Sequence, residues 1–376
     1  MTRRPFTQWL EVASVALAFA LLLQVRPPPI RVTLGEPHTV ETRNPLAGFH
    51  TRFVEEAEEW KIKRGMEMIR EAGAPWIVEF FPWAYYEPTR GQRDFRSAER
   101  IIAHARQQGL TVIARLGFVP EWARPARDAE GNPTTFTFLD PSHYADFAAF
   151  AAAFAERFKG QVQHFIIWNE PNLQNEWGMR RVDAAAYVAL LHAVYPAIKQ
   201  AQPNAVVLAG ALAPTLEQNR DVALSDLDYL RAMYRAARKD GTARPPWDAL
   251  AVHTYGTTFP PDDPPHPQRI NFRRVELLRA IMVEFGDHSP VYITETGWND
   301  APGWVNGVSP AQRVRYTLEA LAFARAHWEW VRCVAFWVFK LPAPAQGYRD
   351  HFTFVTPSLE PLPIYEEMRR ALNPAQ

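Results

Sequence analysis

FIIWNEPN, residues 165–172, is the stretch that decides the fold of this chain. Its first four residues are apolar, and so short a run, bounded by Gly160 and a proline, is typical of a buried strand. Asn169 and Glu170 follow at the carboxyl end of that strand. A carboxylate is costly to bury without partners, and in a parallel barrel this end of the strands carries the chemistry. Glu170 is therefore a candidate catalytic residue, and the plainer alternative is a helix cap or an ion pair with Arg180.

Short apolar runs alternate with longer helix-like segments from about residue 40 onward. We expect strands at 48–50, 76–81, 110–116, 165–168, 205–209 (closed by Gly210), 249–253, 291–295 and 334–339. We expect helices at 55–72, 98–108, 144–158, 184–200 (kinked or ended by Pro196), 226–239, 272–285, 310–327 and 364–372. Eight such pairs predict an α/β protein, a (β/α)8 TIM barrel in a single domain over residues 31–376. The alternative, an open doubly wound sheet, lacks support because no glycine-rich phosphate loop follows any strand.

Residues 1–30 form a separate segment. Arg3 and Arg4 precede an apolar stretch at 12–23, and three prolines follow at 27–29. This order and length are typical of a signal peptide, and the apolar stretch is short for a spanning helix of roughly 20 residues. We therefore expect an exported protein, either secreted or held to the membrane by this segment as an N-terminal anchor. The alternative is an ordinary buried N-terminal helix.

Charge and cysteine content exclude several classes of partner. The 376 residues carry 41 basic and 41 acidic side chains, so nucleic acid is not expected as a partner. The one cysteine, Cys333, excludes an intrachain disulfide and a thiolate metal cluster. Because no His or Cys pair has metal-ligand spacing and no cofactor motif occurs, we expect neither a metal nor a cofactor.

The residues at the predicted strand ends point to sugar chemistry. Glu170 and Glu295 each end an apolar strand, and two carboxyl groups facing each other across a sugar are what glycoside hydrolysis requires. Glu79 and Arg115 also lie at strand ends, where they could simply pair with each other. Trp83 and Trp298 follow strands in the sequence, so their flat rings could stack on a sugar, although loop packing is the alternative.

Several motifs together resemble clan A of the glycoside hydrolases, specifically its cellulase-like and β-xylosidase-like members. WNEP at 168–171 resembles the acid/base motif of strand four, and TETGW at 294–298 resembles the nucleophile motif of strand seven. Three further matches are FPW at 81–83 with the loop that follows it, HTY at 253–255 on strand six, and FW at 336–337 on strand eight. The resemblance covers roughly residues 40–370.

The resemblance implies a retaining glycosidase that cleaves β-glycosidic bonds through a covalent glycosyl-enzyme. Glu170 would act as general acid and then general base, and Glu295 as nucleophile. Four residues would support them: Asn169 on the sugar's 2-hydroxyl, Tyr255 donating to Glu295, His253 in the site wall and Trp337 in its floor. For His253 and Trp337 the alternative is plain core packing.

The expected substrate is therefore a carbohydrate, an oligo- or polysaccharide whose sugar is chosen by the loops. Two other functions stay open on the same scaffold. A transglycosylase would pass the same covalent intermediate to a sugar instead of water. A non-catalytic carbohydrate-binding barrel would keep the fold without activity, because fold does not guarantee function.

Overall fold

The computed structural model describes residues 32–239 and 244–374. The predicted signal or anchor segment, residues 1–30, lies outside them, so export and membrane attachment stay predictions. Within the described ranges, no helix combines the length and apolarity needed to cross a membrane. The unit that begins at Leu34 carries the fold.

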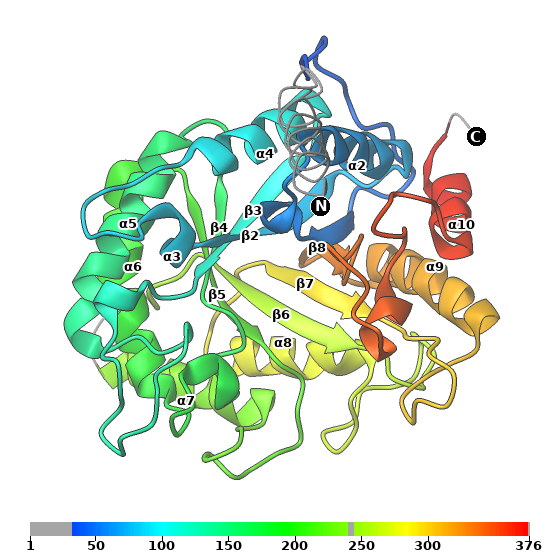
Figure 1. Cartoon of the computed structure of the whole chain (residues 1–376). Helices are drawn as coiled ribbons and strands as arrows, with labels where there is room; N and C mark the ends of the chain where they lie inside the picture. Colours follow the sequence, from blue (N-terminus) through cyan, green and yellow to red (C-terminus); the bar gives the residue numbers. More distant parts are fainter. Residues whose placement is uncertain (1–31, 240–243, 375–376) are drawn as a thin grey trace, which may run out of the picture. The chain divides into compact units, whose positions relative to one another are not determined.

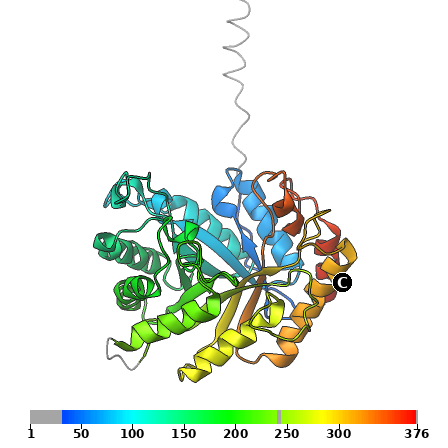
Figure 2. The ribbon, with the colours of Figure 1, turned by 90° about the horizontal axis from the view of Figure 1, so that it is seen from below.

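Eight parallel strands form a closed barrel in chain order, and the helices lie outside it (Figure 1). The strands are β1 Ala47–Thr51, β2 Trp76–Pro82, β3 Thr111–Gly117, β4 His164–Ile167, β5 Val206–Leu212, β6 Ala249–Tyr255, β7 Val291–Gly297 and β8 Val331–Phe336. The view turned by 90° shows the helices surrounding the strands (Figure 2). The predicted TIM barrel is therefore confirmed, and the open doubly wound sheet is wrong because β1 pairs with β8.

The helices follow the strands around the barrel and differ from the predicted ranges mainly at their ends. They are α2 Glu59–Glu71, α3 Trp83–Tyr86, α4 Arg96–Gln107, α5 Tyr144–Arg157, α6 Ala184–Ala201, α7 Asp226–Lys239, α8 Val275–Glu284, α9 Pro310–His327 and α10 Pro363–Leu372. Three short 3-10 turns matter for the site: η1 Phe53–Glu55, η4 Asn175–Trp177 and η6 Tyr348–Phe352.

The strands separate two cores by the alternation of their side chains. Val78, Ile113 and Ile166 point into the barrel and pack together with Leu208 and Ala251. Their neighbours along each strand face outward and join a larger core beneath the helices. In β2, β3 and β4 this period of two decides which side chains lie inside the barrel, whereas shifts of register interrupt it in β5 and β7.

One predicted boundary is wrong, and one alternative is settled. Of the two effects predicted for Pro196, it does not end α6, which runs on to Ala201, because the buried side chains of Val194 and Ile198 hold the helix on both sides of the lost hydrogen bond. Gly210 does not close β5, which continues to Leu212 through a shift of register. Gly210 has φ +93°, and a Cβ there would lie 2.8 Å from a backbone oxygen, so only glycine fits.

Candidate active site

A cavity of about 670 Å³ lies where the carboxyl ends of the strands meet. Strand ends and the loops after them line it. The lining includes five residues that matter most for the chemistry: Arg115, Asn169, Glu170, Tyr255 and Glu295. This is the face on which TIM barrels carry their active sites, so the position of the cavity agrees with the position expected from the sequence.

Glu295, on β7, is almost fully buried and is surrounded by donors. One carboxylate oxygen accepts a hydrogen bond from the Tyr255 hydroxyl at 2.8 Å, and the other accepts one from Arg115 Nη1 at 3.0 Å. The Nε2 atom of His50 lies 3.5 Å from that second oxygen. Burial alone would raise the pKa of Glu295, but His253, His50, Arg115 and the Tyr255 hydroxyl lower it to about 2. Glu295 is therefore ionised at neutral pH.

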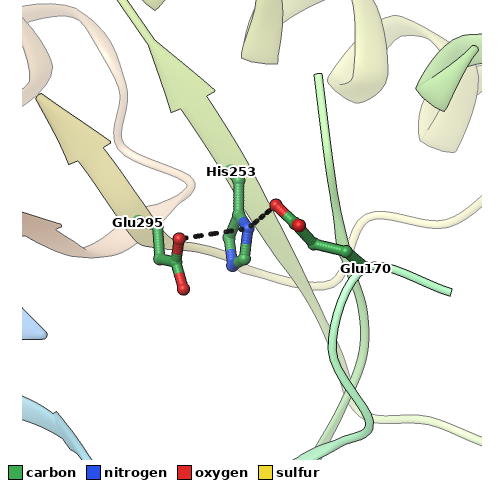
Figure 3. Close-up of side chains that lie close together, drawn as sticks. All are labelled: Glu170, His253 and Glu295. Carbon is green, nitrogen blue, oxygen red and sulfur yellow. Dashed lines mark hydrogen bonds and ion pairs between the residues drawn. The ribbon is translucent and has the colours of Figure 1, made fainter. Parts of the chain in front are cut away.

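His253 lies between the two glutamates (Figure 3) and does not line the cavity. Its Nδ1 atom is 2.8 Å from Glu170 Oε1 and 3.6 Å from Glu295 Oε2. One ring nitrogen of His253 and one carboxylate oxygen of each glutamate lie within 4.8 Å of one another. Burial would lower the pKa of His253, but the charges of Glu295 and Glu170 raise it above its ordinary value. The ring is hydrogen-bonded and only 1% exposed, so it supports the carboxylates from below.

The backbone that presents Glu170 is in an uncommon conformation. Trp168 has φ +74° and Glu170 has φ +40°, both in the left-handed region that non-glycine residues rarely adopt. Each such residue costs about 1–3 kcal/mol and persists only where its surroundings enforce it. Here the amide of Glu170 donates to Ala211 O at 3.0 Å, and the Trp168 indole donates to Glu176 O at 2.7 Å. Strain of this kind concentrates at functional sites.

Arg115, from the inner face of β3, joins Asn169 to the buried glutamate. Its Nη1 atom donates to Asn169 Oδ1 at 2.6 Å as well as to Glu295. The suggested pair between Arg115 and Glu79 does not form. Glu79 faces outward from β2 and accepts hydrogen bonds from the Thr51 hydroxyl at 2.7 Å and the Phe53 amide at 2.9 Å. Glu79 is therefore a structural residue outside the cavity.

Trp337 lines the cavity just after β8, half-buried, where the sequence placed the floor of the site. Trp83 and Trp298 do not reach the cavity. Trp83 is 0% exposed and donates to Glu87, whereas Trp298 is 2% exposed and donates to Phe259 O. The prediction that these two rings contact sugar is wrong for this structure, because both are packed into the core.

Glu176 is a cavity residue that the sequence analysis missed. It lies in η4, six positions after Glu170, and its carboxyl group faces the same cavity. Burial and the charge of Glu170 raise the pKa of Glu176 to about 7. Its loop position gave no pattern from which to predict it. Arg115, by contrast, has the strand parity of inward-facing Ile113, and that parity could have identified it.

The donor set Glu170, His253 and Glu295 is also one that could accept a cation. Within the described residues, however, these atoms already have partners. His253 hydrogen-bonds Glu170, and Arg115 and Tyr255 donate to Glu295. A cation would have to compete with Arg115 and Tyr255 for the oxygens of Glu295.

Solved structures resemble this chain over most of its length. A family 39 glycoside hydrolase from Bacteroides cellulosilyticus matches with a TM-score of 0.68 at 18% identity, over 88% of this chain and 64% of its own. A β-xylosidase from Caulobacter crescentus matches with a TM-score of 0.60 at 17% identity, over 88% and 69%. A β-galactosidase from Marinomonas matches with a TM-score of 0.59 at 11% identity, over 86% and 58%.

These likenesses confirm the fold expected from the resemblance to clan A. The chain spans less than two thirds of the length of the Bacteroides and Marinomonas proteins. No protein-family model matches it, and no curated protein matches it in sequence. The chemistry therefore has to be argued from the cavity itself.

Proposed function

We propose that the protein is a retaining glycosidase that cleaves β-glycosidic bonds of oligo- or polysaccharides. The observation that carries the proposal is the placement of Glu170 and Glu295, whose nearest oxygens lie within 4.8 Å across the cavity. Carboxyl groups roughly 5–5.5 Å apart favour double displacement, whereas inversion needs a wider gap that admits water. The names of the solved structures that share the fold agree with glycoside hydrolysis.

In the first step, an oxygen of Glu295 attacks the anomeric carbon while the bond to the leaving oxygen breaks. The leaving oxygen takes the proton of Glu170, and the sugar stays on Glu295 as an ester. In the second step, Glu170 accepts a proton from water, the water oxygen attacks the anomeric carbon, and Glu295 leaves as a carboxylate. The low pKa of Glu295 suits this role, because it keeps the nucleophile ionised.

The neighbouring residues divide between support and binding. Tyr255 and Arg115 hold the two oxygens of Glu295, which orients the nucleophile. Asn169 has its oxygen on Arg115 and its side-chain amide on Glu176, so one N–H of the amide stays for the sugar's 2-hydroxyl, the contact that the resemblance implies. Trp337 offers a half-buried ring in the cavity wall. His253 acts on both carboxylates and does not line the cavity.

The test is a panel of 4-nitrophenyl β-D-glycosides and matching oligosaccharides, assayed with the wild type, Glu295→Gln and Glu170→Ala. Glu295→Gln should abolish turnover. Glu170→Ala should spare activated aryl leaving groups more than poor ones, since a good leaving group needs little protonation. Proton NMR of the first product should show the β anomer. Activity should also survive a chelator, because no step uses a metal.

Contrary results would separate the alternatives. Full turnover by Glu295→Gln would remove the nucleophile assignment, and an α anomer as first product would remove retention. Products longer than the substrate would identify a transglycosylase. Sugar binding without turnover on any glycoside of the panel would favour a non-catalytic carbohydrate-binding barrel.

A further inference from the structure

We propose that Glu176 is a specificity residue of the same cavity, where its carboxyl group binds a hydroxyl of the reacting sugar and selects neutral units that leave this hydroxyl free. The inference rests on the proposed function. Glu176 stands on a different element from either proposed catalytic glutamate, in the turn η4 between β4 and α6. Its role can therefore be tested apart from theirs.

The main chain at Glu176 is held firmly. Its carbonyl oxygen accepts the Trp168 indole N–H at 2.7 Å, and the next residue, Trp177, is buried with its ring edge-on to Trp168 at 5.8 Å. Gly178 closes the turn at φ +75°, where a Cβ would lie 2.6 Å from the Phe138 backbone. The turn does not need the Glu176 carboxyl group to hold its shape, because these contacts are made by the backbone and by neighbouring rings.

The carboxyl group itself lacks a cationic partner among the described residues. The charge of Arg115 lowers the pKa of Glu176, but Arg115 makes its ion pair with Glu295, at 3.0 Å. The Glu170 charge and burial both oppose ionisation of Glu176, and only Asn169 and Arg115 favour it. A half-buried carboxyl group whose charge is balanced by so few neighbours lowers the stability of the fold, and groups of this kind cluster at functional sites.

Asn169 hydrogen-bonds the Glu176 carboxyl group, and a sugar hydroxyl in the cavity would be its further partner. Near neutral pH the Glu176 carboxyl group is present both with and without its proton, so it can donate to a hydroxyl or accept from one. It hydrogen-bonds Asn169 and lines the same cavity, so it would face the sugar beside the hydroxyl that Asn169 is proposed to contact. A carboxylate or sulfate at that position would meet the negative charge of ionised Glu176 and bind poorly.

The experiment compares the wild type with Glu176→Ala and the isosteric Glu176→Gln. The probes are 4-nitrophenyl β-D-glucopyranoside and β-D-xylopyranoside with their 2-deoxy and 3-deoxy analogues. We expect Glu176→Ala to lower kcat/KM on the parent glycoside by about 10- to 100-fold, the effect of one hydrogen bond to a carboxyl group. On the analogue that lacks the contacted hydroxyl, the same substitution should change kcat/KM less than about twofold. Glu121→Ala, an exposed glutamate after β3, is the matched control and should behave like the wild type.

The same comparison can be made without turnover. Calorimetric binding of these glycosides to Glu295→Gln, with and without Glu176→Ala, should show the weakening for the parent and its disappearance for one deoxy analogue. Equal losses on the parent and all analogues, or no loss at all, would overturn the assignment. Turnover retained by Glu295→Gln would instead count against the proposed function, whatever Glu176→Ala does to binding.

Discussion

His253 Nδ1 lies 2.8 Å from Glu170 Oε1 and 3.6 Å from Glu295 Oε2, so one imidazole ring joins the two carboxylates of the site (Figure 3). Among the neighbours that lower the pKa of Glu295, this ring has the largest effect. The same nitrogen of the ring hydrogen-bonds Glu170. The protonation of this ring and the chemistry of both glutamates are therefore coupled.

Replacing His253 by Gln should lower kcat/KM by about 10- to 100-fold, because a positioned partner of both carboxylates is lost. It should also move the acid limb of the pH profile upward. Without the imidazolium, the pKa of Glu295 rises from about 2 toward its ordinary value, so the nucleophile becomes protonated at a higher pH. The pH dependence of kcat/KM measures this. His143→Gln, remote from the cavity, is the control, and an unmoved acid limb in His253→Gln would contradict the coupling.

Tyr255→Phe removes one hydrogen bond to the nucleophile and little else. The hydroxyl donates to Glu295 Oε2 at 2.8 Å, while the ring packs edge-on against Phe352 at 5.6 Å and keeps that contact in the variant. We expect kcat to fall about tenfold and the free energy of unfolding to change by no more than about 1.5 kcal/mol. Stopped assays and urea unfolding measure the two effects. A large loss of stability with unchanged kcat would make Tyr255 a packing residue.

Strand periodicity explains how much of the site could be predicted. His253 and Tyr255 are two positions apart on β6, so both point inward once the strand is assigned. Glu295 has the parity of outward-facing Ile293 and reaches the cavity only through a shift of register near the end of β7, which the period of two does not predict. The prediction that Trp83 and Trp298 contact sugar is wrong because a position just after a strand does not fix the direction in which the side chain points. Glu176 was missed for the same reason, since only the folded turn η4 aims it at the cavity.

Glu79→Gln tests the assignment of that residue to the fold. Its carboxylate accepts from the Thr51 hydroxyl and from two backbone amides, those of Phe53 and Val54. The Gln side-chain NH2 would face a donor, so we expect a loss of about 1–3 kcal/mol in the free energy of unfolding with kcat unchanged. Glu130→Gln, exposed on a loop, is the control. Reduced kcat at full stability would give Glu79 a role in catalysis instead.

The stability change in Glu79→Gln should depend on pH. Burial raises the pKa of Glu79 to about 7 in the folded protein, from its ordinary value of 4.5. The folded state then holds its proton where the unfolded state has lost it, so the wild type loses stability as pH rises from about 4.5 to about 7. The variant lacks this loss, and the difference in unfolding free energy should shrink across that range. A constant difference would contradict the raised pKa.

Trp304→Ala should separate binding at the rim of the cavity from chemistry at its centre. Trp304 is stacked on Tyr348 at 4.9 Å and 14°, and its ring lies edge-on to Phe352, which in turn packs edge-on against Trp337. These rings form a continuous wall from the proposed reacting centre to the cavity mouth, where Tyr348 is 45% exposed. Flat rings suit sugar faces, so the outer part of the wall should hold a unit of a longer substrate.

The expected result is a rise in KM of about tenfold on oligosaccharides, the size of one aromatic contact, with kcat/KM on 4-nitrophenyl glycosides nearly unchanged. Trp60→Ala, which truncates a partly exposed tryptophan on the outer helix α2, should affect neither substrate. If Trp304→Ala weakened both substrate types equally, the ring would act through the packing of Phe352 and Trp337 on the centre. If Trp304→Ala weakened the binding of neither substrate, the outer units of the longer substrate would lie along a different side of the cavity.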